Sequence, residues 1–390
     1  RKSNLFEAMN FKYFGPIDGH NVSNLVKILS EIKNISGPKL FHVITTKGKG
    51  FKKAEEKQTV YHAPGKFNRI TGELLKVEAD TLPATYQKVF GKTLVEIAEK
   101  NEKLVAITPA MPTGSALTYM MEKFPARVFD VGIAEQHAVT FAAGMAAEGL
   151  KPFCTIYSTF LQRAYDQVIH DVALQKLPVV FCIDRAGLVG EDGATHHGAY
   201  DMAFMNNIPG MVISAPMNEV ELRNLMFTAF NYYSGPFSIR YPRNRGVLND
   251  WNIPLERIEV GKGRCLAVGN EIAILSIGYA GNFVEEALNQ LAMDNIYPGH
   301  YDMRFLAPID EEMLRHIFEN YTQIITVEDG SITGGLGTIV AVAKSTHNYT
   351  GKLISLGIPD RFIGHGDIET LHKACGYDAD SIVITVKSIR

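Results

Sequence analysis

The organisation of the chain is clearest in the segment Phe129-Asp-Val-Gly-Ile-Ala-Glu-Gln-His-Ala-Val-Thr-Phe-Ala-Ala-Gly-Met-Ala-Ala147. Residues 128–131 are typical of a short buried strand, which Gly132 ends. Apolar side chains then recur at helical spacing, which predicts a helix over 134–147. Because this helix carries almost no charge, we expect it to lie between other layers of the fold.

Glu135 stands in the first turn of this predicted helix. A carboxylate gains from the helix dipole there, but in dry surroundings it also needs a partner. One interpretation is that Glu135 caps its own helix. The other is that it is a buried titratable group of a catalytic site. This segment alone favours the capping interpretation, and the rest of the chain shifts the balance.

Composition sets the class of protein. The chain has 390 residues, which indicates two or three domains, and its net charge of −3 gives no argument for a nucleic-acid or membrane-surface partner. No apolar run has transmembrane length, and the sequence leads us to expect no signal peptide. The four cysteines lack metal-ligand spacing. Cys154 and Cys182 lie in apolar runs, so we expect reduced core residues of a cytoplasmic protein.

Residues 1–66 hold too little structure for a domain. A helix over 22–32 and a strand over 39–45 cannot bury a core, so we expect the end of a larger α/β domain whose N-terminal part is missing. Gly15-Pro-Ile-Asp-Gly-His20 is interpreted as a turn cluster. After the strand comes Thr46-Lys-Gly-Lys-Gly-Phe51, well placed to meet an anionic ligand, although a solvated turn explains it equally well.

The remainder shows two alternations of strand and helix. The first, over 85–245, predicts a parallel sheet covered on both faces, and residues 67–84 before it are interpreted as a linker. A second, less regular connection over 246–266 leads to another alternation over 267–390. There Gly334-Gly-Leu-Gly337 opens a helix but lacks the Walker lysine and the dinucleotide fingerprint, which favours close helix packing.

Polar side chains collect after the strands of the first alternation, where ligands bind in parallel sheets. Three strand ends offer four arginines, two histidines and a carboxylate. Arginine binds phosphate bidentately, and His196 beside Asp192 suits proton transfer. A surface salt bridge explains any single arginine better, but four at one rim favour an anionic-substrate site. The groups are Tyr157, Arg163, Arg185, Asp192, His196, His197, Arg240 and Arg243.

Six segments together resemble the 1-deoxy-D-xylulose-5-phosphate synthases, thiamine-diphosphate enzymes of the transketolase group. They are 15–20, 46–51, 130–139, 157–166, 184–196 and 240–243. The resemblance covers nearly the whole chain in order. It implies an α/β fold with a parallel-sheet pyrimidine-binding domain over 85–245 and a smaller mixed-sheet C-terminal transketolase domain over 267–390. Residues 1–66 would then be the remnant of the diphosphate-binding domain.

The resemblance also implies a reaction and a dimer. Pyruvate and D-glyceraldehyde 3-phosphate would condense, with loss of carbon dioxide, to 1-deoxy-D-xylulose 5-phosphate, a precursor of isoprenoids, thiamine and pyridoxal. Thiamine diphosphate carries the difficult step. Enzymes of this family form homodimers, so we expect one here.

Site residues follow from the same resemblance. Glu135 would hydrogen-bond N1′ of the cofactor's aminopyrimidine, Phe160 would stack on that ring, and Ile133 would lie under the bent cofactor. Phe51 would border the cofactor with Lys47 or Lys49 close by. Two further sets are implied. The aldehyde phosphate would be held by Tyr157, Arg163, Arg185 and Arg243, and pyruvate addition or proton transfer would be guided by His196, Asp192 and His62.

One departure from the family matters. Its Gly-Asp-Gly motif and later Asn, which hold Mg²⁺ and the diphosphate, have no counterpart in this sequence. We therefore expect the magnesium ligands to lie outside this chain, which alone would bind the cofactor weakly or not at all. Two alternatives stay open. One is another transketolase-type enzyme or a 2-oxo-acid dehydrogenase β-like chain, and the other is a non-catalytic dimerising fragment.

Overall fold

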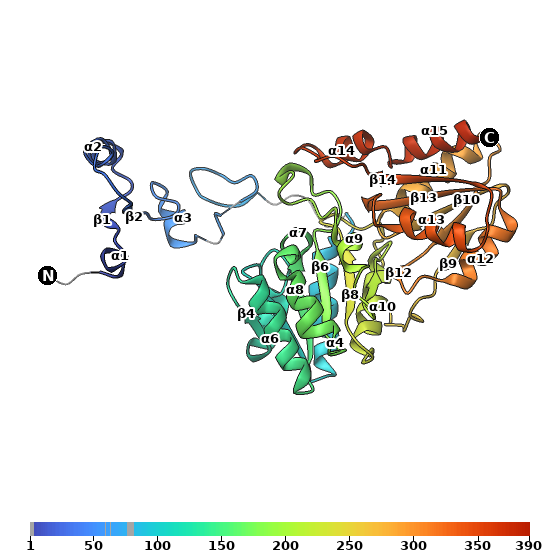
Figure 1. The fold of residues 1–390 in the computed structure, drawn as a ribbon, viewed down its shortest axis with the longest axis horizontal. Helices are drawn as coiled ribbons and strands as arrows, with labels where there is room; N and C mark the ends of the chain where they lie inside the picture. Colours follow the sequence, from blue (N-terminus) through green and yellow to red (C-terminus); the bar gives the residue numbers. More distant parts are fainter. Residues whose placement is uncertain (1–3, 59, 63, 76–81) are drawn as a thin grey trace. The chain divides into compact units, whose positions relative to one another are not determined.

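The computed structural model describes residues 4–58, 60–62, 64–75 and 82–390 and divides the chain into two units, 1–81 and 82–390 (Figure 1). In the first unit β1 (Lys12–Asp18) pairs in parallel with β2 (Lys39–Ile44). The expected helix is α2 (Val22–Ile32), begun by the side chain of Asn21, and two short helices are α1 (Leu5–Ala8) and α3 (Lys52–Glu56). The turn predicted over 15–20 is wrong for residues 15–18, which belong to β1, and is confirmed for Gly19 and His20.

The second unit contains a seven-stranded sheet in the order β12-β7-β8-β6-β5-β3-β4. All neighbouring strands run parallel except β12, which is antiparallel to β7. Strands such as β3, β5, β6 and β8 are buried at every position, which is typical of a parallel sheet with both faces covered. The parallel sheet that the sequence predicts is therefore confirmed. The strands are β3 (Leu104–Thr108), β4 (Val128–Asp130), β5 (Lys151–Tyr157), β6 (Val180–Asp184), β7 (Val212–Ser214), β8 (Phe237–Tyr241) and β12 (Phe305–Ala307).

Helices cover both faces of this sheet. On one face α4 (Tyr86–Glu99), α5 (Thr118–Lys123) and α10 (Glu219–Phe230) share an apolar core with the strands. On the other face α6 (Glu135–Ala147) and the segment after β5 share a core that continues into the C-terminal part of the unit. The expected interior position of α6 is confirmed on this side, where Ala138, Val139 and Ala142 are buried.

The C-terminal part forms a five-stranded sheet in the order β14-β13-β10-β11-β9, parallel except for β9. The close packing predicted for the glycines at the start of α13 is confirmed. A Cβ on Gly337 would lie only 2.4 Å from Oγ of Ser355. The strands are β9 (Arg264–Ala267), β10 (Ile272–Ile277), β11 (Gly299–Asp302), β13 (Gln323–Ser331) and β14 (Lys352–Ile358). The helices here are α11 (Ala280–Ala292), α12 (Glu311–Asn320), α13 (Leu336–Thr346), α14 (Ile368–Cys375) and α15 (Ala379–Ile389).

One strand, β12, connects the two sheets of this unit, and no pattern in the sequence predicts it. β11 ends at Asp302, and β12 leaves to pair with β7 of the other sheet. Arg304 at this crossing binds Glu221 of α10 with both Nε and Nη2, at 2.7 and 2.8 Å. Arg264 bridges the same Glu221 and Asp302, each at 3.0 Å. A buried ion network therefore ties the C-terminal sheet to the first one.

Acid should destabilise this unit through His300 on β11. The side chain is buried, Nε2 lies 2.8 Å from Oγ of Ser276, and Nδ1 has no partner among the described residues. Burial, helped by the Arg264 charge, lowers the pKa of His300 from 6.5 to about 4. The folded state thus takes up this proton later than the unfolded state, so stability falls as the pH drops from 6.5 towards 4. His300→Gln should remove about 3 kcal/mol of that fall.

Urea unfolding at neutral pH and at about pH 4 measures this difference. His316→Gln is the matched control, because His316 is exposed on α12. An unchanged dependence of the unfolding free energy on pH in His300→Gln would contradict the assignment.

Among the helices of the described residues, none has both the length and the apolar character needed to span a bilayer.

Candidate active site

Glu135 begins α6 at the edge where β3 and β4 end. The turn before it is held by Asp130, whose Oδ1 accepts hydrogen bonds from the N–H groups of Ala110 and Gly132 at 2.8 and 3.0 Å. Gly132 has a φ of +73°, which favours glycine. Glu135 itself is only 4% exposed. The sequence thus places a carboxylate at a buried helix start.

The carboxylate of Glu135 does not cap its own helix. Its Oε1 accepts a hydrogen bond from Nη1 of Arg163 at 2.9 Å, and Oε2 has no hydrogen-bond partner within the part of the chain that the structure describes. Beside it Ile133 is 83% exposed, which is unusual for a large apolar side chain next to a buried acid. The capping interpretation is therefore wrong, and Oε2 of Glu135 remains an unused acceptor among the described residues.

A broken helix after β5 carries the next groups. In place of one regular helix, the chain forms α7 (Ser158–Leu161), a 3₁₀ turn, α8 (Tyr165–Gln167) and a π turn over Val168–Ala173. Phe160 in α7 stacks with Tyr157 at the end of β5, with ring centres 5.7 Å apart and planes 11° apart. π turns inside helices frequently accompany functional sites.

These groups form one continuous row of contacts. The guanidinium of Arg163 lies 5.3 Å from the centre of the Phe160 ring, and the His196 ring meets the same phenyl ring edge-on at 5.5 Å. On the other side of the stack, the Arg185 guanidinium lies 4.1 Å from the centre of the Tyr157 ring. The row therefore runs from the Glu135 carboxylate through two aromatic rings to an arginine.

Arg185 and Arg243 line one open cavity of about 470 Å³, here called the arginine pocket. Gln87, Lys88, Thr113 and Gly114 also line it. Lys88 adds a third cation, and the hydroxyl of Thr113 adds a donor. Such a set of donors suits a phosphate group.

Backbone and side-chain contacts hold the two arginines. Arg185 adopts a φ of +58°, a costly conformation for a residue with a side chain and one that clusters at functional sites. Its guanidinium pairs with the neighbouring Asp184 and donates to the Gly114 carbonyl at 2.8 Å. Arg243 pairs with Asp192 at the protein surface. Burial raises the pKa of the Tyr157 hydroxyl above its usual range, so it remains a neutral donor.

Three of the polar residues at the predicted rim turn out to make other contacts. Arg240 lies inside, 4% exposed, with Nε 2.8 Å from Oδ2 of Asp201, so the expectation of four rim arginines is wrong. His197 is also buried and holds its loop, because Nδ1 accepts the Val189 N–H and Nε2 donates to the Gly364 carbonyl. Arg163 meets Glu135 and is not among the residues that line the arginine pocket.

The remaining predicted residues belong to the first unit. Phe51 packs against Tyr61, with ring centres 5.5 Å apart. Lys49 lies 3.7 Å from Glu55, and Lys47 and His62 are exposed. Their roles stay predictions, because the two units are described separately. Across the described residues, no three His, Cys, Asp or Glu side chains are grouped to hold a metal ion.

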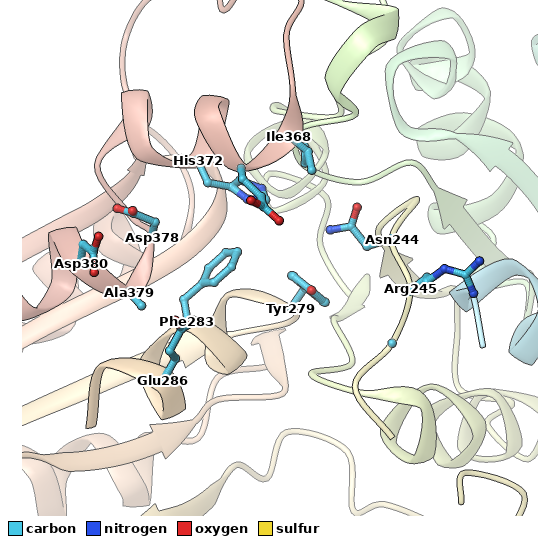
Figure 2. Close-up of a pocket in the computed structure, with 12 residues that line it drawn as sticks. Asn244, Arg245, Tyr279, Phe283, Glu286, Ile368, His372, Asp378, Ala379 and Asp380 are labelled. Carbon is cyan, nitrogen blue, oxygen red and sulfur yellow. The ribbon is translucent and has the colours of Figure 1, made fainter. Parts of the chain in front are cut away.

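A second cavity, of about 690 Å³, lies among α11, α14, α15 and the chain after β8 (Figure 2). Figure 2 shows Tyr279 and Phe283 on one side and Asp378 and Asp380 on another. Glu286 and Glu369 also line it, and Arg245 is its only arginine. Four carboxylates against one guanidinium do not suit a phosphate, so the arginine pocket is the better anion site.

Comparison with known proteins now identifies the family. Three family models match: 1-deoxy-D-xylulose-5-phosphate synthase over residues 1–45, the transketolase pyrimidine binding domain over 83–246, and the transketolase C-terminal domain over 261–382. The 1-deoxy-D-xylulose-5-phosphate synthase of Cytophaga hutchinsonii is 56% identical over 391 residues, which cover 100% of this chain and 62% of that protein. The chain belongs to the 1-deoxy-D-xylulose-5-phosphate synthase family.

Other members of the synthase family give the same result. The synthase of Chlorobaculum tepidum is 50% identical over 97% of this chain and 60% of its own length. This chain thus spans about three-fifths of the length of the curated relatives it matches. A solved chain titled "Split gene transketolase, inactive beta4 tetramer" is similar with a TM-score of 0.71 and 29% identity, over 78% of this chain and 98% of that one.

Gly114 should be sensitive to a single added methyl group. A Cβ there would lie 2.3 Å from the Tyr157 hydroxyl and 3.4 Å from Nη2 of Arg185. The Tyr157 side chain must move, and Arg185 packs against its ring. Gly114→Ala should therefore weaken binding of glycerol 3-phosphate by about tenfold, for a misplaced charge-assisted hydrogen bond. Calorimetry on the complete protein measures it. Gly144→Ala, where a Cβ meets nothing within 4 Å, is the control, and equal affinity of both variants would contradict the prediction.

Proposed function

We propose that this chain supplies the pyrimidine-binding and C-terminal domains of an enzyme that makes 1-deoxy-D-xylulose 5-phosphate. The enzyme condenses pyruvate with D-glyceraldehyde 3-phosphate and releases carbon dioxide. One observation carries the proposal: the row of contacts from the Glu135 carboxylate through Phe160 and Tyr157 to Arg185, in a chain whose curated relatives bear this synthase name.

The residues present fit thiamine diphosphate. Glu135 is buried, and its Oε2 is free to hydrogen-bond a ring nitrogen. Phe160 offers a ring to stack on, and exposed Ile133 offers an apolar support beside the acid. When bound, the cofactor supplies the electron sink for decarboxylation and carbon–carbon bond formation. Glu135 would hydrogen-bond the aminopyrimidine, and the contact with Arg163 holds its carboxylate in place.

The aldehyde phosphate binds in the arginine pocket. Arg185 and Arg243 offer guanidinium donors, and Tyr157 remains a neutral hydroxyl beside Arg185. Arg163 already pairs with Glu135, so a contact with the phosphate would require Arg163 to leave that carboxylate. Arg243 must exchange its surface pair with Asp192 for the phosphate, a small cost for an exposed ion pair.

Proton transfer to the substrate oxygens is assigned to the loop after β6. His196 meets the edge of Phe160 and thus lies next to the ring on which the pyrimidine would stack. Asp192 lies at Arg243, on the phosphate side. His62 of the first unit completes the set that the family resemblance implies. We further propose a cytoplasmic homodimer, with Mg²⁺ held by residues outside this chain.

Product analysis tests the function. The complete protein, given thiamine diphosphate, Mg²⁺, pyruvate and D-glyceraldehyde 3-phosphate, should release carbon dioxide and form 1-deoxy-D-xylulose 5-phosphate. The 390-residue chain alone should not, which the similar solved chain whose title calls its tetramer inactive supports. Transfer of a two-carbon unit between sugar phosphates instead would favour a transketolase activity and overturn the proposal.

A further inference from the structure

The two arginines of the pocket lie on neighbouring strand ends that separate. β6 and β8 pair in register up to Asp184 opposite Tyr241, and the Ala186 N–H still donates to the Tyr241 carbonyl at 3.1 Å. The next residue on β8's side, Pro242, has no N–H to donate. The ladder therefore stops one residue short of Arg243, and the distance between the two arginines is not set by sheet hydrogen bonds.

Gln87 connects the two strand ends at this point. It projects from the first turn of α4, is 8% exposed and lines the arginine pocket. Its single amide nitrogen, Nε2, donates to Oδ1 of Asp184 at 2.6 Å and to the carbonyl of Pro242 at 3.0 Å. One side chain thus contacts the residue before Arg185 and the residue before Arg243.

The Asp184 contact reaches Arg185 directly. Asp184 is fully buried, its Oδ1 also accepts the Arg185 N–H at 2.7 Å, and its Oδ2 pairs with the Arg185 guanidinium. A buried carboxylate takes the orientation that satisfies its hydrogen-bond donors, because an unpaired buried charge is costly. Losing the Gln87 donor would let the carboxylate rotate, and the guanidinium would rotate with it. Because Arg185 also holds a φ of +58°, its position depends on these side-chain contacts.

Helix α4 does not need Gln87 for its own anchoring. The Thr85 side chain caps its first turn by accepting the Lys88 N–H at 3.3 Å. The Tyr86 hydroxyl, fully buried, donates to the Met217 carbonyl at 2.8 Å. Both contacts remain when the Gln87 amide is removed. The contribution of that amide is therefore directed at the strand ends and not at the helix.

We propose that Gln87 is a positioning residue that sets the spacing of Arg185 and Arg243 and thereby selects aldehydes that carry a phosphate. The proposal rests on the function proposed above. It predicts a specific split: binding of the phosphate-bearing substrate weakens when the amide is lost, while the chemistry at Glu135 does not change.

Kinetics of the complete protein measure this split. Gln87→Met keeps length and apolar bulk but removes both hydrogen bonds. KM for D-glyceraldehyde 3-phosphate should rise by about 10- to 50-fold, as for two lost hydrogen bonds, one of them to a charged group. The kcat, KM for pyruvate and kcat/KM for unphosphorylated D-glyceraldehyde should each stay within about twofold, since none depends on the arginine spacing.

Gln323→Met is the matched control. Its amide also donates one hydrogen bond, to the Ile389 carbonyl at 2.8 Å, but it lies on β13 in the other sheet. This variant should leave every kinetic constant within about twofold of the wild type. Equilibrium binding of glycerol 3-phosphate, compared with glycerol, gives a second readout that needs no turnover.

The outcomes separate the inference from the function on which it rests. Wild-type protein that neither turns over the aldehyde nor binds glycerol 3-phosphate overturns both. If the wild type does both and Gln87→Met matches it, the inference fails while the function stands. If Gln87→Met loses activity equally towards phosphorylated and unphosphorylated aldehydes, its role is structural and the inference also fails.

Discussion

Glu135→Gln should lower kcat of the complete protein by about 10²- to 10⁴-fold, the range for a lost acid–base group. The substitution keeps the size of the side chain and can still meet Arg163, but it removes the charge that the proposal requires beside a ring nitrogen. KM for D-glyceraldehyde 3-phosphate should change little, because Glu135 is not among the residues that line the arginine pocket.

The fold should tolerate the change. The Arg163 side chain is 55% exposed, so the Glu135→Gln substitution does not leave its guanidinium as a buried unpaired charge. Melting temperature and circular dichroism check this. Glu148→Gln, an exposed acid at the other end of α6, is the control and should keep full activity. A Glu135→Gln enzyme that retained most of its kcat would remove the role assigned to this carboxylate.

Arg243→Met should have the next largest effect. Loss of a charge-assisted hydrogen bond to phosphate costs about 1.5–3 kcal/mol, which corresponds to a rise of about 10- to 150-fold in KM for D-glyceraldehyde 3-phosphate. The kcat at saturating aldehyde should stay within about threefold, because the contact is made in both ground state and transition state. Steady-state kinetics with the aldehyde varied at saturating pyruvate give both constants.

Arg243 is a better test position than Arg185. Arg243 and its partner Asp192 are both about half exposed, so removing the guanidinium leaves a hydrated carboxylate. Arg185→Met would strand the fully buried Asp184 and destabilise the protein by about 3–5 kcal/mol, which would obscure the kinetics. Arg257→Met, at an exposed arginine between the two sheets in sequence, is the control. An unchanged KM in Arg243→Met would exclude Arg243 from the phosphate site.

Much of the sheet and the centre of the site could be predicted from the sequence. Buried runs such as 153–157 and 237–241 and the turn at Gly132 are local signals, and parallel strands bring their polar ends to one edge. This is why Arg185 and Arg243 were expected together and do line one pocket. Glu135 stood out because a single acid interrupts an uncharged helix.

Other features depend on contacts that no local pattern encodes. Gln87 looks like a surface residue of a helix start, yet its partners lie 97 and 155 residues further along the chain. Arg240 was counted at the rim, but alternation along β8 turns it to the interior, where Asp201 neutralises it. β12 follows a strand of one sheet and joins another, at a crossing where Arg304 pairs with Glu221. Each of these features involves a polar or charged contact between residues far apart in the sequence.

Exchange of the thiazolium C2 hydrogen of thiamine diphosphate with solvent tests most directly whether Glu135 activates the cofactor. The exchange is followed by rapid acid quench and NMR on the complete protein with Mg²⁺ and without substrate. The wild type and Arg243→Met should accelerate exchange equally over free cofactor, and Glu135→Gln should lose at least about 100-fold of that acceleration. Equal exchange rates in the wild type and Glu135→Gln, with cofactor bound to both, would contradict the role of this carboxylate.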